Sequence, residues 1–304
     1  MTPRVLITGG TGFIGLPCTR RAIDAGAEVH VLARHRPDTL PESAAFHEAD
    51  FTKPTTFVEA CHAVRPTHLL HLAWVTAPGA YWSAPENRDW QRESFHLVLA
   101  FRQCGGRRAA VAGTCAEYDW SAGGVCRESR TPTRPATLYG TCKSELRHEL
   151  VALSERFELS LAWPRLFFLY GPREHPARLV PSVTNALLAG RPAETTAGTQ
   201  ERDFLHVEDA ADALVRLLLS DVSGPVNIGS GEPVAVRTVV EAVADIIGRP
   251  DLLRLGAKPT PPNEPPQLYA DVGRLRNEVE WTPRIGLRQG LADTVAWWRD
   301  SDAA

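Results

Sequence analysis

The amino-acid sequence predicts an α/β protein in which helices cover both faces of a doubly wound parallel sheet. Short apolar runs alternate with helical stretches through the first half of the chain, and a glycine-rich turn follows the first run directly. Beyond residue 171 the segments become shorter and richer in proline, notably over residues 258–266. The alternation is typical of βαβ crossovers, which build parallel sheets. The change of rhythm predicts a smaller α/β domain interleaved with the first.

Each expected element rests on a local pattern. The run Val5-Leu6-Ile7 predicts the first strand, and the glycine turn after it leads into the first helix. Later strands are short apolar runs, and the last helix of the first half has apolar residues at helical spacing. The expected strands cover residues 5–7, 29–32, 46–49, 68–72, 109–112 and 159–163. The expected helices cover residues 15–25, 57–63, 90–103 and 139–157. The larger domain is expected over residues 1–170 with a return segment near 203–229, and the smaller mainly over 171–304.

Composition excludes several classes of protein. Of the 304 residues, 43% are hydrophobic and 23% are charged, and the net charge is −3. That charge is too weak to favour nucleic-acid binding. No apolar run reaches the roughly 18 residues of a membrane span, and the N-terminus does not resemble a signal peptide, so we expect a cytoplasmic protein. The six cysteines form no Cys-x-x-Cys motif, which indicates free thiols. His62, His68 and His71 fit no metal-ligand spacing.

The glycine turn predicts a dinucleotide site. Gly9, Gly12 and Gly15 follow the first strand at spacings that permit a tight turn and let backbone amides approach a pyrophosphate. The helix that begins there has an N-terminus that favours an anion. Phe13 and Ile14 are expected to pack the turn. A tight strand-to-helix turn without a ligand is the alternative.

The next strands indicate which dinucleotide binds. An NAD site expects an acidic residue about 20 residues past the glycines, but the second strand ends in Ala33-Arg34-His35-Arg36. Arg34 and Arg36 suit a 2′-phosphate, which favours NADPH over NAD. Both arginines could instead belong to a solvated loop. Asp50, after the third strand, could face the adenine amino group or cap a loop.

Three residues form a candidate catalytic set. Tyr139 and Lys143 lie four residues apart and therefore share one helix face. An ammonium beside a phenol, whose ordinary pKa is about 10, is expected to lower that pKa. Thr114 follows a strand at the edge where active-site groups collect in open α/β sheets, and its hydroxyl can bind a substrate oxygen. An ordinary amphipathic helix is the alternative.

Together these stretches resemble an extended short-chain dehydrogenase/reductase of the nucleotide-sugar epimerase/dehydratase family, and the similarity covers almost the whole chain. The resemblance lies in residues 8–15, 71–73, 113–118, 139–143, 164–172, 200–209, 227–229, 281–283 and 290–291. It implies a Rossmann fold with cofactor contacts from the glycine turn, including Thr11, and from Leu72 and Ala73. Tyr139 and Lys143 would contact the cofactor as well. Arg202 would lie near a substrate diphosphate, unless it forms a surface salt bridge with Asp203 or Glu201.

The resemblance also implies a reaction. Dehydrating members carry Thr-Asp-Glu where this chain has Thr114-Cys115-Ala116, and Glu117 is expected on the other side of the strand. Thr114, Cys115 and Ala116 are expected to face the substrate. We therefore expect an NADPH-dependent 4-ketoreductase of a nucleotide-linked 4-keto-6-deoxyhexose, with a nucleotide-sugar 4-epimerase second and a dinucleotide sensor third. Phe168 and Leu169 are expected to form an apolar wall. The helices at 90–103 and 139–157 resemble the pair that forms a homodimer in the family.

Overall fold

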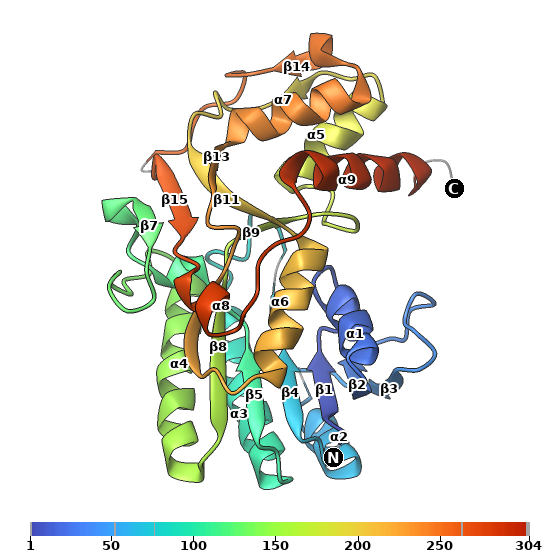
Figure 1. The fold of residues 1–304 in the computed structure, drawn as a ribbon, viewed down its shortest axis with the longest axis vertical. Coiled ribbons are helices and arrows are strands. Elements are labelled where there is room, and N and C mark those ends of the chain that lie inside the picture. The colour runs from blue at the N-terminus through green and yellow to red at the C-terminus, as the bar shows by residue number, and fades with distance from the viewer. Residues whose placement is uncertain (1, 52, 76, 263, 302–304) are drawn as a thin grey trace.

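The computed structural model describes residues 2–51, 53–75, 77–262 and 264–301. Its larger sheet contains eight strands in the order β12-β8-β5-β4-β1-β2-β3, with β6 beside β8 (Figure 1). All of its pairings are parallel. The strands are β1 (Arg4–Thr8), β2 (Glu28–Ala33), β3 (Ala45–Glu48), β4 (His68–His71), β5 (Arg108–Val111), β6 (Gly113–Thr114), β8 (Ser160–Leu166) and β12 (Gly224–Ile228). The predicted α/β fold with a doubly wound parallel sheet is confirmed.

Helices cover both faces of this sheet because side chains alternate along each strand. In β1, Val5 and Ile7 belong to one buried cluster and Leu6 belongs to the other. The first cluster lies under α1 (Gly15–Asp24) and α6 (Val207–Leu219), which pack on each other. The second lies under α2 (Pro54–Val64), α3 (Asn87–Gln103) and α4 (Leu138–Phe157).

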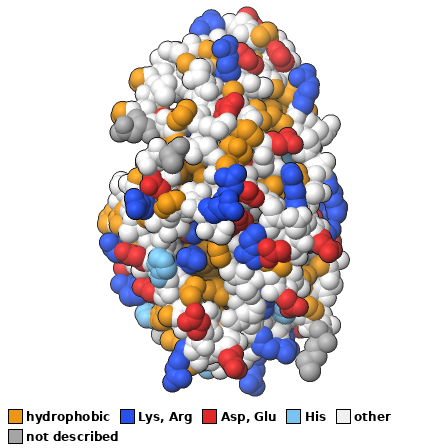
Figure 2. Space-filling model, turned by 60° about the vertical axis from the view of Figure 1, so that its left-hand side comes forward, with side chains coloured by type: hydrophobic (Ala, Val, Ile, Leu, Met, Phe, Trp, Pro, Cys, Tyr) orange, Lys and Arg blue, Asp and Glu red, His pale blue; other side chains and the backbone are white. Residues whose placement is uncertain are grey.

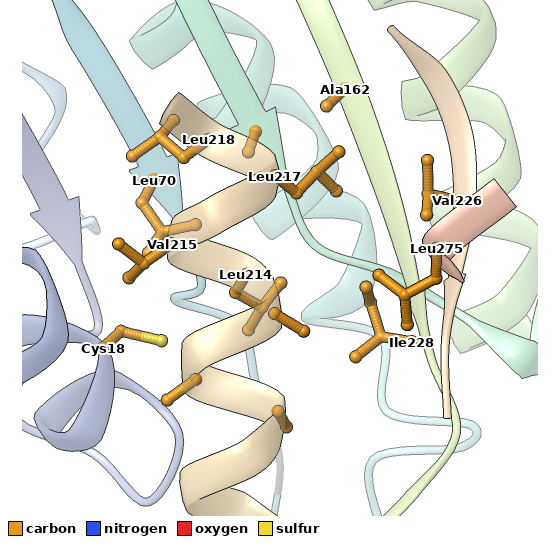
Figure 3. Close-up of a cluster of buried hydrophobic side chains, with 14 of the residues drawn as sticks. Cys18, Leu70, Ala162, Leu214, Val215, Leu217, Leu218, Val226, Ile228 and Leu275 are labelled. Carbon is orange, nitrogen blue, oxygen red and sulfur yellow. The ribbon is translucent and has the colours of Figure 1, made fainter. Parts of the chain in front are cut away.

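The buried face of α6 shows how the first cluster is filled. Leu214, Leu217 and Leu218 of α6 are fully buried, and Figure 3 shows Leu214 and Leu217 on the side of the helix that faces Val226 and Ile228 of β12. Figure 3 also shows Val226 and Ile228 of β12 on the side of α6 away from Cys18 of α1. Residues more than 200 positions apart therefore share one core, which explains why the chain returns to the large sheet after leaving it.

The smaller sheet lies above the carboxyl ends of the large one (Figure 1). Its order is β13-β11-β15-β7, and β9 pairs with β11. These strands are β7 (Gly124–Cys126), β9 (Phe168–Tyr170), β11 (Glu201–His206), β13 (Pro233–Ala235) and β15 (Gln267–Ala270). A third core joins α5 (Leu179–Leu188), α7 (Val236–Ile247) and α9 (Leu287–Ser301). The short elements are β10 (Ala193–Glu194), β14 (Leu253–Arg254), α8 (Gly273–Asn277), and the 3-10 turns η1 (Cys115–Glu117), η2 (Trp120–Ala122) and η3 (Pro250–Leu252).

The chain passes between the two sheets more than once. The smaller sheet therefore includes β7 and β9, which come from the first 170 residues. The connection from β9 to β12 runs through α5, β11 and α6 before it rejoins the large sheet. None of the described helices has the length and apolarity to cross a membrane. Acidic and basic side chains are interspersed on the face shown in Figure 2.

Candidate active site

The glycine turn lies at the carboxyl end of β1, beside the end of β4. Gly9 has φ +68°, and a Cβ there would lie 2.9 Å from the backbone nitrogen of Ala73. Gly12 closes the turn by donating its N–H to the carbonyl of Gly9 at 3.0 Å. A Cβ at Gly15 would overlap that same carbonyl. Only glycine fits at positions 9 and 15, so the backbone of this turn can come close to a neighbouring segment or a ligand.

The turn also prepares an anion site at the start of α1. No side chain caps this helix. Leu16 and Cys18 donate their N–H groups to the carbonyls of Gly12 and Ile14, and Pro17 has no N–H, so an anion would bind to the amides of the turn that precedes them. Gly12 is exposed, while Thr11, Phe13 and Ile14 are half-buried around it. That this turn holds a dinucleotide pyrophosphate stays a prediction.

A buried polar relay joins β1, β4 and α3 behind the turn. The Thr8 hydroxyl lies 2.6 Å from Nδ1 of His71, and Nε2 of His71 lies 2.8 Å from the Ser94 hydroxyl. Burial, assisted by the charge of Lys143, lowers the pKa of His71 to about 3. His71 is therefore a neutral structural group. Ala73 donates its N–H to Thr8 Oγ1 at 3.3 Å, which fixes the segment after β4 against the turn.

The structure places Arg34 and Arg36 just beyond the end of β2, where both are exposed. Asp50 follows β3 and is half-buried. Its backbone N–H donates to Thr56 Oγ1 at 3.0 Å, and its carbonyl accepts from Lys53 at 2.8 Å. Asp50 therefore sits at the entry to α2, at the same edge of the sheet as the glycine turn.

Thr114, Tyr139 and Lys143 come together where η1 meets the start of α4. Thr137 caps α4 by accepting the N–H of Gly140 at 3.1 Å. A Cβ at Gly140 would overlap the carbonyl of Ala116, so this glycine lets α4 approach η1 closely. The side chains of Thr114 and Tyr139 share a hydrogen bond. Buried Lys143 donates from Nζ to the carbonyl of Ala112 at 2.7 Å.

The electrostatics of Tyr139 differ from the sequence-based expectation. We expected Lys143 to lower the pKa of the phenol, but burial raises that pKa, and the hydrogen bond with Thr114 only partly opposes the rise. Burial also lowers the pKa of Lys143 to about 7, against the opposing charge of Glu117. Desolvation explains both shifts, because it disfavours the charged form of each group, the phenolate of Tyr139 and the ammonium of Lys143. Tyr139 therefore holds its proton at neutral pH.

An aromatic enclosure around Tyr139 was not predicted. Tyr139 meets the rings of Trp74, Tyr81 and Trp82 edge-on, at centroid distances of 6.4, 5.0 and 5.8 Å. The backbone N–H of Tyr139 also donates to the carbonyl of Trp82 at 3.1 Å. Trp120 extends the enclosure beyond Trp82, at 6.1 Å. A concentration of aromatic residues directly after His71-Leu72-Ala73 was the available signal in the sequence.

Glu117 corrects the expected position of the local carboxylate. We expected it on the opposite side of an extended strand, but residues 115–117 form a 3-10 turn, and its side chain is fully buried. Oε1 accepts the N–H of Thr114 at 2.8 Å and Nε1 of Trp163 at 2.9 Å, and Oε2 accepts Nε of Arg165 at 3.0 Å. Glu117 is thus a structural anion that holds Thr114 in place. Cys115 and Ala116 are also buried.

Arg202 lies in β11 and is 4% exposed. It forms an ion pair with Glu264 and donates to the carbonyl of Glu201 at 2.7 Å. The alternative of a surface salt bridge with Asp203 or the Glu201 carboxylate is therefore wrong, because the side chain turns inward. Its guanidinium lies 5.7 Å from the ring of half-buried Phe168. The charged side chain of Arg202 is therefore next to one of the two residues expected to form the apolar wall.

The histidines noted in the sequence do not converge. His62 lies 3.5 Å from the thiol of Cys104, and His68 lies 2.8 Å from the Thr67 hydroxyl. Within the described residues, no cluster of three or more His, Cys, Asp or Glu side chains could hold a metal ion. All six cysteines are buried free thiols.

Comparison with known proteins places this geometry in a family. The model of the NAD dependent epimerase/dehydratase family matches residues 5–229. The chain belongs to this family. The resemblance to extended short-chain dehydrogenases/reductases is thereby confirmed, and the chain is an enzyme of the epimerase/dehydratase family.

Relatives with different activities align along nearly the full chain. A UDP-glucose 4-epimerase from Azospirillum brasilense is 27% identical over 99% of this chain and 93% of its own length. A dTDP-4-dehydro-6-deoxy-D-allose reductase from a Streptomyces species is 28% identical over 97% and 96%. The crystal structure of Thermus thermophilus UDP-glucose 4-epimerase in complex with NAD superposes with a TM-score of 0.84 at 27% identity, covering 97% of this chain and 99% of that chain. Family membership therefore leaves the individual reaction to be argued from the site.

Proposed function

We propose that the protein reduces the C4 ketone of a nucleotide-linked 4-keto-6-deoxyhexose with NADPH. Reduced nicotinamide, when bound, supplies a hydride to the carbonyl carbon. Tyr139 gives its phenolic proton to the oxygen that becomes the alcohol, and the Thr114 hydroxyl orients that oxygen. Lys143 balances the phenolate that remains. Residues 171–304 would supply most of the substrate site, with Arg202 and Phe168 on its wall.

The observation that carries this proposal is the state of the acid and of the nearest carboxylate. A ketone reduction needs a proton donor, and half-buried Tyr139, whose pKa is raised from its ordinary value by desolvation, is protonated at neutral pH. Elimination of water needs carboxyl groups free to act as acid and base. Glu117, the one acid in residues 113–118, is bound by Thr114, Trp163 and Arg165. This arrangement favours reduction over dehydration.

The preference for NADPH rests on the end of β2. Arg34 and Arg36 stand exposed at the position where an acid would bind the ribose hydroxyls of NAD. Arginine is suited to a 2′-phosphate because its planar fork donates two parallel hydrogen bonds. We therefore propose NADPH as the preferred cofactor, with Asp50 near the adenine.

A nucleotide-sugar 4-epimerase is the second candidate. Its support is the similarity to UDP-glucose 4-epimerases along the full chain, one of them solved with NAD. An epimerase would oxidise C4 and then return the hydride, so it would retain its cofactor and consume none. A dinucleotide sensor is the third candidate, although a sensor would not need the assembled Thr114, Tyr139 and Lys143.

One experiment separates these candidates. The purified protein is examined for the absorbance of retained nicotinamide and then mixed with NADPH and a dTDP-4-keto-6-deoxyhexose. Consumption of NADPH in step with the sugar supports the reductase. Retained cofactor and sugar interconversion without net consumption supports the epimerase, and tight NADPH binding without turnover supports the sensor. Tyr139→Phe is expected to lower kcat by about 10²–10⁴-fold while binding NADPH normally. Normal turnover by that variant would contradict the catalytic assignment.

We also propose that the protein is a homodimer that pairs through α3 and α4. These helices pack side by side and are tied by the ion pair of Arg88 with Glu145 at 2.9 Å. Their outer faces would form a four-helix arrangement with a second copy. Sedimentation equilibrium tests this, because a monomer mass at all concentrations would contradict it.

A further inference from the structure

Trp74 lies against the candidate catalytic lysine. It follows Ala73 at the carboxyl end of β4, and it is 8% exposed. Its indole N–H donates to Oδ1 of Asn87 at 2.8 Å. Asn87 is fully buried, and its amide donates to the carbonyls of Tyr81 and Ala84 at 2.7 and 2.8 Å. The plane of the indole is therefore fixed from the start of α3.

The face of this fixed ring covers the ammonium of Lys143. Nζ lies 3.7 Å from the ring centroid, on the side away from bulk water, because Lys143 is 2% exposed. An ammonium carries three donors, and the carbonyl of Ala112 accepts one of them at 2.7 Å. The electron-rich face of an indole attracts a cation, most strongly where both are desolvated. The ring thus takes the place of water around a buried charge.

We propose that Trp74 is a positioning residue that holds Lys143 charged and in place beside Tyr139 through a cation–π contact. The proposal rests on the proposed function only in the role that Lys143 has there. Trp74 acts through the lysine and need not touch the substrate.

The surroundings of Lys143 explain why such a contact matters. Burial alone works against the charged form and lowers its pKa to about 7. The titratable groups that interact with it are His71 on β4 and Glu117 on η1, and Tyr139 lies four residues before it on α4. His71 is neutral above about pH 3 and adds no charge. Glu117 favours the ammonium, but three other donors already share its carboxylate. The Trp74 face favours the cation without placing a further anion near a phosphate-bearing cofactor.

The chain offers a direct measurement because it contains only three lysines, at positions 53, 143 and 258. Lys53 and Lys258 are exposed, so Lys143 is the one whose environment is dry. The protein is labelled with [13Cε]-lysine and titrated by NMR, and the Lys143 signal is assigned by its loss in Lys143→Arg. In Trp74→Leu we expect the pKa of Lys143 to fall by about one pH unit, because the ammonium loses a desolvated cation–π contact.

The matched control is Trp90→Leu. Trp90 packs in the same aromatic cluster, 6.3 Å from Trp74 and 4.9 Å from Phe51, so its loss perturbs packing to a similar degree. We expect the pKa of Lys143 to stay within experimental error in this variant. An equal fall in both variants would mean that packing, and not the indole face, sets the pKa, and it would overturn the proposal.

A shape-preserving variant covers the case in which Trp74→Leu does not fold. Site-specific replacement of Trp74 by tetrafluorotryptophan keeps the ring outline but removes most of its negative face. The pKa of Lys143 should again fall, and the alkaline limb of the pH profile of kcat/KM should move to lower pH with it. An unchanged pKa in the fluorinated protein would overturn the proposal.

These readouts separate the proposal from the proposed reaction. The NMR titration needs no substrate, so a lowered pKa together with failure to consume NADPH would sustain the role of Trp74 and reject the reductase. NADPH consumption with an unchanged pKa would do the reverse.

Discussion

Replacing Glu117 by Gln removes one buried charge and leaves the shape of the side chain almost unchanged. The wild-type carboxylate accepts hydrogen bonds from Thr114, Trp163 and Arg165. Glu117 is 0% exposed and Arg165 is 1% exposed. The Arg165 guanidinium also lies 4.4 Å from the ring of Tyr118. That ring is not an anion, so it cannot replace the Glu117 carboxylate as a partner. In Glu117→Gln the amide keeps an acceptor for the first two donors, but it leaves the Arg165 cation buried and unpaired.

The magnitude follows from this burial. Breaking a buried ion pair by neutralising one partner costs about 3–5 kcal/mol, because the remaining charge cannot regain water. Whole domains are stable by only roughly 5–15 kcal/mol. We therefore expect Glu117→Gln to lose about a fifth or more of the free energy of unfolding. Glu117→Gln combined with Arg165→Met should recover part of the loss, since it removes the orphaned cation as well.

Urea unfolding followed by tryptophan fluorescence and far-UV circular dichroism measures the effect. The matched control is Glu241→Gln, whose carboxylate pairs with Arg237 at 3.0 Å where the two side chains are 44% and 50% exposed. That exposed pair should contribute less than about 1 kcal/mol. A loss below about 1 kcal/mol in Glu117→Gln would refute the reasoning. So would a change in the shape of its activity–pH profile at low temperature, which would mean that Glu117 exchanges protons during the reaction.

Three further predictions concern the cofactor site and pH. Gly15→Ala should weaken NADPH binding at least about 10-fold, because its Cβ would overlap the carbonyl of Gly9; Gly286→Ala, which has open space around its Cβ, should bind normally in the same fluorescence titration. Arg34→Ala should reduce the ratio of kcat/KM for NADPH over NADH by about 10-fold or more, and an unchanged ratio would reject the 2′-phosphate assignment. His71 has a folded pKa of about 3, below its unfolded value of about 6.5, so its contribution to stability is present above pH 6.5 and is lost as the pH falls. Between pH 7 and pH 5 wild-type should lose about 2 kcal/mol more than His71→Asn, and equal slopes would show that His71 does not titrate as expected.

Local patterns predicted the large sheet well. An apolar run bounded by a turn identifies a buried strand whatever its neighbours are, so the expected strands agree with the structure to within about three residues at their ends. The helix expected over 90–103 begins earlier, at Asn87, because Asn87 turns its side chain inward to satisfy two carbonyls and the Trp74 indole. These hydrogen bonds join Asn87 to residues in the preceding loop. The spacing of apolar residues along the helix therefore does not predict them.

The candidate site was predictable where its residues lie in one motif and not where they meet across the fold. Tyr139 and Lys143 lie on one helix, and Thr114 ends a strand. Their proximity could therefore be predicted from the sequence. The partner of Arg202 is Glu264, 62 residues later. The 3-10 turn at 115–117 reverses the expected direction of Glu117 within three residues. Contacts of this kind depend on how separate segments pack, which one sequence read locally does not contain.

The buried charges behind Tyr139 connect these features to the proposed reaction. When the phenol gives up its proton, a phenolate forms in a site whose burial already disfavours that charge. Lys143, one helical turn further along α4, is the cation that can balance it. Burial brings its pKa to about 7, so at neutral pH its charge depends on what surrounds the ammonium. Three neighbours favour the charged form in this proposal: the ring face of Trp74, the carboxylate of Glu117 and the carbonyl of Ala112. We therefore expect the chemistry of the tyrosine in the proposed reaction to depend on how well residues outside the Thr-Tyr-Lys set keep the lysine protonated.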